Sequence, residues 1–339
     1  MSQLEVYGSL PGIGDRNYLK AVIEIVQTCE KFNFTGALIQ YNHKVPDPWV
    51  LTLKILQHST KFIPLIAIQP YSMPPFTLAK SIASVAYLYN RRVYLNMISG
   101  SNPKELQEVG DEINHSERYI RLNEYIHIVK KLLSHQDVFT YEGDYYNYRN
   151  LRYFEPGIKK NILPKFFIGG SSDNGGSNEN ISLTNPEPID MFKNYFVHKY
   201  KENRELGIRI GIITRKTDIE AWSVAKDYFP TNRLAYIRCK FNRESESSWK
   251  QRLALLTENE VYDQTYWLGS VLSGRSHSPF LVGNYEKVAE YLFRYIQCGV
   301  KHIILASPQE EYEENANVIN IVKDYINKRG SKEAINFES

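Results

Sequence analysis

The chain has 339 residues, 42% of them hydrophobic and 13% aromatic, which is enough apolar material for a large core. Its net charge of +3 comes from interspersed lysines, arginines and acids, so neither a nucleic-acid-binding nor an anionic-membrane surface is expected. There is no basic-then-apolar leader and no apolar run of about 18 residues, so we expect a cytoplasmic protein without a membrane span.

The first half of the chain alternates short apolar runs with amphipathic segments. The second half continues this alternation less regularly, with an aromatic and polar segment at residues 137–154 that predicts a hairpin. Strands are expected at residues 4–10, 35–41, 62–68, 93–98, 166–168, 208–214 and 302–306, with a weak one near 181–183. Helices are expected at residues 17–31, 77–89, 117–134, 189–205, 218–228, 285–298 and 310–328, and one begins at Pro48 behind a capping Asp47.

Apolar strands that alternate with helices indicate a parallel sheet covered by helices. The regular spacing of the first four strands favours a TIM (β/α)8-type barrel over an open sheet. We expect one domain over residues 1–339, with a mostly helical insertion at about 230–279 that ends in a flexible active-site loop at 269–278. A long loop is expected at 173–188. Cys29, Cys239 and Cys298 have no metal or redox spacing, so free thiols are expected.

In such a barrel the residues just after the strands form the active face. Five groups of candidates follow from this rule: Asn42 and His43, Ser99, Ser171 and Ser172, Arg209, and Ser307. The run Gly169–Gly170–Ser171–Ser172 could cradle a phosphate with backbone N–H groups and hydroxyls, or could be a plain turn. Asp111–Glu112 and Glu310–Glu311 are expected on solvated faces.

Three further positions each leave two interpretations open. His115 and Tyr119 lie four residues apart and could bind a cofactor together, or could be a helix cap and a core aromatic. Arg209 lies inside an apolar strand, so it either binds an anion or substrate or belongs to a structural ion pair. His43 and His277 fall on loops, where they either transfer protons or are surface residues.

Several ordered motifs resemble one family over residues 18–325. The sequences from Asn96 to Pro103, His115 to Tyr119 and Phe167 to Asp173 are similar to the bacterial luciferase-like flavin monooxygenases. The nearest branch is that of the alkanesulfonate monooxygenases, which residues 35–39, 47–49, 207–210 and 281–283 also resemble.

The resemblance implies a TIM-like barrel that uses reduced FMN, supplied by a separate flavin reductase, and O2 to oxidise an organic substrate. It also implies a homo-oligomer, either a dimer or a tetramer. It assigns FMN contacts to Asn96, Ser99, His115, Tyr119, Gly170, Ser171 and Ser172. Arg209 and His43 are the catalytic candidates, and Asn42, Trp49 and Arg275 the substrate candidates; no metal is expected.

The groups that handle sulfonate in that branch are not retained. Val45 stands where the branch has a cysteine, Gly211 where it has a histidine, and Ser307–Pro308 where it has a tyrosine. We therefore expect a different substrate: a hydroxylation in specialised metabolism such as antibiotic biosynthesis, with an acyl group on a carrier protein as the candidate. The alternatives are a non-catalytic flavin-binding protein and a deazaflavin-dependent oxidoreductase.

Overall fold

The computed structural model describes residues 4–12, 17–100, 103–134, 138–152, 162–169, 180–194, 205–234, 237, 248–256 and 259–335. The chain divides into two compact units, which we name the N-terminal unit (residues 10–27 and 36–182) and the C-terminal unit (residues 1–9, 28–35 and 183–339). Two elements contribute residues to both units, α1 (Tyr18–Lys31) and β8 (Ile181–Thr184).

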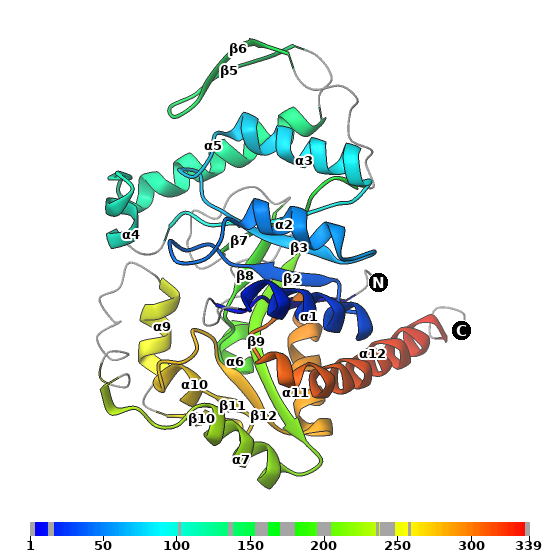
Figure 1. The fold of residues 1–339 in the computed structure, drawn as a ribbon. Helices are drawn as coiled ribbons and strands as arrows, with labels where there is room; N and C mark the ends of the chain where they lie inside the picture. The colour runs from blue at the N-terminus through cyan, green and yellow to red at the C-terminus, as the bar shows by residue number, and fades with distance from the viewer. Residues whose placement is uncertain are drawn as a thin grey trace. The chain divides into compact units, whose positions relative to one another are not determined.

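The N-terminal unit is built on four neighbouring parallel strands, in the order β2, β3, β4 and β7. Their bounds are Gly36–Ile39, Ile63–Ile68, Tyr94–Met97 and Phe166–Gly169. The helices of this unit are α2 (Pro48–Gln57), α3 (Pro75–Tyr89), α4 (Pro103–Glu108) and α5 (His115–Ser134), and α3 packs alongside α5 (Figure 1). Each predicted strand and helix of this unit is present, and only α4 was not predicted.

Local hydrogen bonds explain where two elements of this unit begin and turn. The carboxylate of Asp47 accepts from the backbone N–H groups of Trp49 and Val50, at 2.9 and 3.0 Å, which confirms the predicted cap of α2. The predicted hairpin forms from β5 (Phe139–Glu142) and β6 (Asn147–Leu151), and Glu124 of α5 accepts from the backbone N–H of Tyr146 in its turn, at 2.9 Å.

The C-terminal unit contains four parallel strands in the order β12, β9, β13 and β1. Their bounds are Phe280–Asn284, Leu206–Arg215, Val300–Leu305 and Glu5–Ser9. The ten-residue β9 pairs with β13 through its first half and with β12 through its second half, so β12 extends this sheet at the carboxyl end of β9. β10 (Val261–Tyr262) and β11 (Tyr266–Trp267) continue the sheet from β12 with antiparallel pairing.

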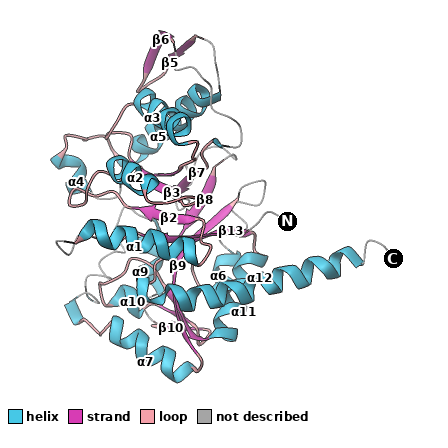
Figure 2. Ribbon diagram, turned by 45° about the vertical axis from the view of Figure 1, so that its right-hand side comes forward, coloured by secondary structure: helices cyan, strands magenta, loops and turns pink. Residues whose placement is uncertain are grey.

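The helices of the C-terminal unit follow the predicted order. They are α6 (Ile189–Phe192), α7 (Asp218–Tyr228), α9 (Ser248–Leu256), α10 (Gly269–Leu272), α11 (Tyr285–Gln297) and α12 (Tyr312–Ile335), with a 3-10 turn, η4, at Gln309–Glu311. α11 and α12 pack side by side (Figure 2). Strand β12 was not predicted. The described part of the predicted helical insertion contains α9 and α10 and also the small β10–β11 pair.

Side-chain contacts establish which face of each sheet the helices cover. A Cβ at Gly8 would meet Tyr312 of α12 and the Cys29 thiol, so on β1 the helix-covered face is that of Gly8, and Tyr7 points the other way. In the N-terminal unit Lys130 of α5 lies over the Phe166 ring, at 5.2 Å, so Phe167 faces the sheet interior.

The fold class is a (β/α)8 barrel, as predicted, with β1, β2, β3, β4, β7, β8, β9 and β13 as its strands. In the part of the chain that the structure describes, no helix is long and apolar enough to cross a membrane. The same residues contain no cluster of three or more His, Cys, Asp or Glu side chains suited to a metal ion.

Candidate functional site

The carboxyl end of β4 carries two of the predicted flavin contacts. Asn96 pairs in register with Ala67 and Phe167, so it shares the interior face with Phe167. Ser99 follows the strand and is 8% exposed. The next residue, Gly100, has a φ of +92° and lies against Leu106 of α4, so a side chain there would be both strained and crowded. Gly100 thereby fixes how the chain leaves β4 beside Ser99.

His115 and Tyr119 lie together at the start of α5. Their rings meet edge to face with 5.2 Å between centroids, and both residues are half-buried. The cap of this helix is Asn114, whose side chain accepts from the backbone N–H of Glu117 at 3.0 Å. The prediction of His115 as the helix cap is therefore wrong, whereas the half-buried Tyr119 leaves both of its interpretations open. The pair is available to a ligand, and its flavin role stays a prediction.

Of the predicted phosphate cradle, the structure describes Gly169. Gly170, Ser171 and Ser172 lie outside the described residues. Gly169, the last residue of β7, is half-buried. The cradle therefore remains a prediction.

Arg209 lies on β9 opposite Ile304, which in turn pairs with Tyr7, so Arg209 shares the interior face with them. Among the described residues Arg209 has no ion-pair partner, and its buried Nε atom has no hydrogen-bond acceptor. Burial lowers the pKa of Arg209, and the neighbouring Tyr312 hydroxyl opposes this shift. Of the two interpretations, a structural ion pair finds no support in the described part of the chain.

Three of the remaining candidates belong to the N-terminal unit. Asn42 uses its side-chain oxygen to accept from the backbone N–H of Lys44, at 2.8 Å. His43 is exposed and contacts the Glu108 carboxylate through Nδ1, at 3.2 Å. Trp49 is 9% exposed, and its indole N–H has no acceptor among the described residues. The roles of all three stay predictions, and Trp49 is the one whose polar group is not otherwise engaged.

The segment 269–278 is not the flexible loop that its Gly and Ser content suggests. Its first residues form α10, and the buried Ser270 hydroxyl donates to the Ser278 carbonyl at 2.9 Å. The Ser278 hydroxyl donates to Asn185 at 2.7 Å. Arg275 is exposed and donates to the Tyr228 carbonyl at 2.9 Å, so its predicted substrate role finds no geometric support in the C-terminal unit.

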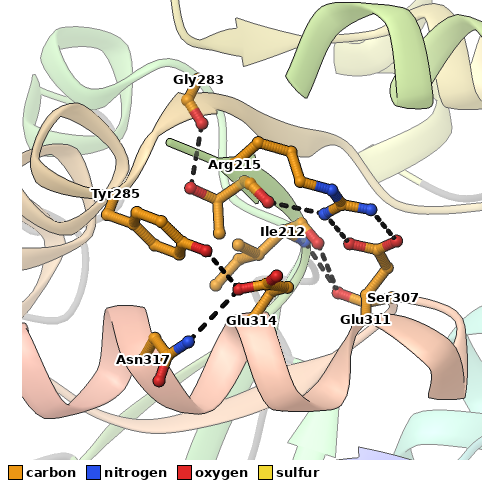
Figure 3. Close-up of polar contacts among 9 residues, drawn as sticks. Ile212, Arg215, Gly283, Tyr285, Ser307, Glu311, Glu314 and Asn317 are labelled. Atoms are coloured by element: carbon orange, nitrogen blue, oxygen red, sulfur yellow. Dashed lines mark hydrogen bonds and ion pairs between the residues drawn. The ribbon is translucent and has the colours of Figure 1, made fainter. Parts of the chain in front are cut away.

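Several other polar residues that follow strands are structural. The Ser307 hydroxyl accepts from the backbone N–H of Ile212 at 2.8 Å and donates to the carbonyl of the same residue at 3.1 Å (Figure 3). The prediction that Glu311 is solvated is wrong: Glu311 is 1% exposed and forms a bidentate ion pair with Arg215, with N···O distances of 2.7 and 2.8 Å. Asp111 is likewise paired with Arg121, at 2.8 and 2.7 Å.

The sequence interpretation missed Gln69, the first residue after β3. By strand alternation it shares the interior face with Leu65 and Ala67, and Ala67 pairs in register with Asn96. Gln69 is 7% exposed, and its side-chain oxygen has no partner among the described residues. The signal was present in the sequence, because a polar residue directly follows an apolar strand.

Comparison with known proteins agrees with this geometry. The luciferase-like monooxygenase family matches residues 5–302. BtrO of Niallia circulans, a monooxygenase of 4-(gamma-L-glutamylamino)butanoyl-BtrI acyl-carrier protein, is 38% identical over 322 residues, which are 92% of this chain and 94% of that relative.

Two solved structures share the fold at low sequence identity. The EDTA monooxygenase EmoA of Chelativorans sp. BNC1 has a TM-score of 0.70 at 16% identity and covers 95% of this chain and 94% of its own. The second is the oxygenating constituent of 3,6-diketocamphane monooxygenase from Pseudomonas putida, solved in complex with FMN. It has a TM-score of 0.67 at 14% identity, and the match covers 94% of this chain and 97% of that chain. The chain belongs to the luciferase-like monooxygenase family and is a monooxygenase.

Proposed function

We propose that this chain is the oxygenating component of a two-component system, which takes reduced FMN from a separate reductase and hydroxylates an acyl group carried on an acyl-carrier protein. The observation that carries the proposal is the 38% identity, over nearly the whole chain, to a monooxygenase of an acyl-carrier-protein substrate. The protein is further proposed to be a single-domain cytoplasmic dimer or tetramer.

The described residues fit a flavin. After β3, in and after β4 and at the start of α2, the N-terminal unit offers neutral hydrogen-bonding groups: the amides of Gln69 and Asn96, the Ser99 hydroxyl and the indole N–H of Trp49. Neutral donors and acceptors suit a ring system with an alternating N–H and C=O edge. Asn96, Ser99, His115 and Tyr119, with Gly170, Ser171 and Ser172, would hold FMN, which when bound supplies the oxygen chemistry.

Arg209 is the proposed catalytic residue of the C-terminal unit. Its guanidinium faces the interior of the sheet without an acid partner among the described residues, so it can stabilise negative charge that develops on a substrate during oxidation. The burial of Arg209 would strengthen this interaction, because charges attract more strongly at low dielectric.

A structural observation supports a substrate other than a sulfonate. A Cβ built on Gly211 would lie 2.3 Å from the Phe280 ring, and Phe280 is fully buried against Phe229. The space that a histidine would need at this position in the sulfonate branch is therefore filled by an aromatic ring.

The test is turnover of the wild-type protein with chemically reduced FMN and isotopically labelled dioxygen, first on an acyl group on a carrier protein and then on the free acid. We expect the carrier-bound acyl group to gain one labelled oxygen atom, detected by mass spectrometry of the carrier. Binding of FMN without oxidation of either substrate would contradict the proposal. Oxidation of the free acid alone would contradict the carrier-bound substrate.

A further inference from the structure

Gln69 carries a buried carboxamide in the N-terminal unit. Gln69 is 7% exposed, and its side-chain oxygen makes no hydrogen bond to any described residue. A buried polar group without a partner costs about 1–3 kcal/mol, so native proteins rarely keep one without a reason. The cost is offset when a ligand supplies the missing hydrogen bond.

The surrounding backbone does not need this side chain. The turn after β3 is closed by the main-chain carbonyl of Gln69, which accepts from the backbone N–H of Ser72 at 3.0 Å and from the Ser72 hydroxyl at 2.7 Å. Both bonds would persist with any side chain at position 69. Turn formation therefore does not explain why a polar side chain is placed here.

The position of Gln69 points to the proposed flavin and substrate site. It follows the carboxyl end of β3 on the interior face, and β3 is paired in register with the strand that carries Asn96. Trp49, on the helix α2 that packs against β3, also keeps a buried N–H without an acceptor in the described residues. Two independent unpartnered groups thus belong to elements that contact each other.

A carboxamide presents one acceptor and one donor side by side, and this remains true if its oxygen and nitrogen are exchanged. Its complement is a planar edge with an adjacent N–H and C=O. Two components of the proposed reaction carry such an edge: the pyrimidine ring of FMN, and an amide in the acyl chain or its carrier arm.

We infer that Gln69 is a ligand-binding residue that pairs its carboxamide with a planar N–H/C=O edge, on FMN or on an amide-containing acyl substrate. This inference rests on the proposed function. Gln69 acts by binding and orientation and takes no part in proton or electron transfer.

The experiment compares Gln69→Leu, which is similar in size but has no polar atoms, with the matched control Gln57→Leu at the exposed last residue of α2. FMN affinity is measured by quenching of flavin fluorescence, and KM is measured with the carrier-bound acyl substrate. We expect Gln69→Leu to weaken one of the two by about tenfold while Gln57→Leu changes neither. A loss of FMN affinity assigns the flavin edge, whereas a raised KM with normal FMN affinity assigns a substrate amide.

Unchanged FMN affinity and unchanged KM in Gln69→Leu, with wild-type turnover intact, would overturn the inference. Failure of the proposed function is a separate result, because then the wild-type protein itself forms no product. If Gln69→Leu does not fold, as judged by thermal unfolding, Gln69→Glu keeps the shape and one acceptor but removes the donor. We expect Gln69→Glu to weaken FMN affinity or to raise KM for the carrier-bound substrate. Wild-type values of both quantities in Gln69→Glu would overturn the inference.

Discussion

At the carboxyl ends of β9, β12 and β13 in the C-terminal unit, polar side chains bind one another and the backbone. Ser307 bonds twice to Ile212, the Thr214 hydroxyl donates to the Gly283 carbonyl at 2.9 Å, and Arg215 pairs with Glu311 (Figure 3). After β3 in the N-terminal unit, the Gln69 side-chain oxygen has no partner among the described residues. Both sets occupy the position where a barrel places its active face.

This difference separates polar groups that build the fold from those that are free to bind. A paired group contributes to stability and is not available to a ligand, whereas an unpaired buried group is a cost that a ligand can remove. Arg209 departs from this pairing within the C-terminal unit, because it faces the interior without an acid partner in the described chain; the buried amide of Asn315 in α12 also has no partner there. The contrast therefore supports the proposed role of Arg209 in binding or catalysis, whereas Arg215 is structural.

The largest effect on stability is expected from Glu311→Gln. This change removes the negative charge of the carboxylate that forms the bidentate ion pair with Arg215. It should lower the free energy of unfolding by about 3 kcal/mol, because Glu311 is buried. Urea unfolding followed by circular dichroism measures it, with the exposed neighbour Glu310→Gln as control. A loss no greater than that of the control would mean that the pairing in this unit does not stabilise the fold.

Arg209→Ala should have the opposite profile. Loss of the unpaired guanidinium should lower product formation by about a hundredfold and leave FMN affinity unchanged, since a positive charge is removed from the reaction but not from the flavin contacts. Product per reduced FMN is the measurement. Burial lowers the pKa of Arg209, but an arginine remains charged at neutral pH, so Arg209→Lys should recover part of the activity. Wild-type product yield in Arg209→Ala would show that the unpaired charge is not used in the reaction.

A matched pair of serine variants tests the comparison more finely. Ser307→Ala removes two hydrogen bonds and should lower the free energy of unfolding by about 1 kcal/mol, with FMN affinity unchanged. Ser99→Ala should weaken FMN binding about fivefold with little change in stability, because Ser99 is a predicted flavin contact. Flavin titration and urea unfolding of both variants decide it. If Ser307→Ala weakened FMN binding and Ser99→Ala lowered the free energy of unfolding, the distinction between paired structural groups and unpaired binding groups would be wrong.

The sequence predicted elements best where apolar periodicity and a local cap agree. The bounds of α7 were predicted as observed, and Thr217 and Glu220 form its capping box. Strand β12 was missed because the short run Phe280–Asn284 follows a serine-rich segment that was interpreted as one loop. β12 pairs with the second half of β9, where β9 no longer pairs with β13. The periodicity of the sequence gives no signal for such an added strand.

The candidate site was predictable only in part, for a physical reason. Arg209 could be found because a charged residue inside an apolar strand is visible in the sequence, whereas Asn96 was indicated by the resemblance to the family. The pairing of Glu311 and the isolation of Gln69 depend on residues far away in the chain, so local sequence cannot distinguish them. Adjacent acids at 310 and 311 look alike in sequence, yet one is exposed and the other is buried in an ion pair.

The smallest expected effect concerns pH and the paired network of the C-terminal unit. Asp218 accepts from the backbone N–H of Asn284 at 2.7 Å and from the Lys287 ammonium at 3.1 Å, and these contacts, the Asn284 bond foremost, lower the pKa of Asp218. A carboxyl whose pKa is lower in the folded state stabilises the fold above its unfolded pKa of about 4, and this contribution is lost as the pH falls through the folded value.

Asp218→Asn should therefore lower stability slightly at pH 7 and leave it nearly unchanged at a pH below the folded pKa of Asp218. Urea midpoints measured across this range test the sign. The control is Asp227→Asn on the same helix, whose carboxyl has no lysine or backbone contact among the described residues. Because Asp218 is partly exposed, solvent screens the contact with Lys287 and the difference should be small. A loss of stability in Asp218→Asn that was equal at both pH values would mean that the side chain acts through packing and not through its charge.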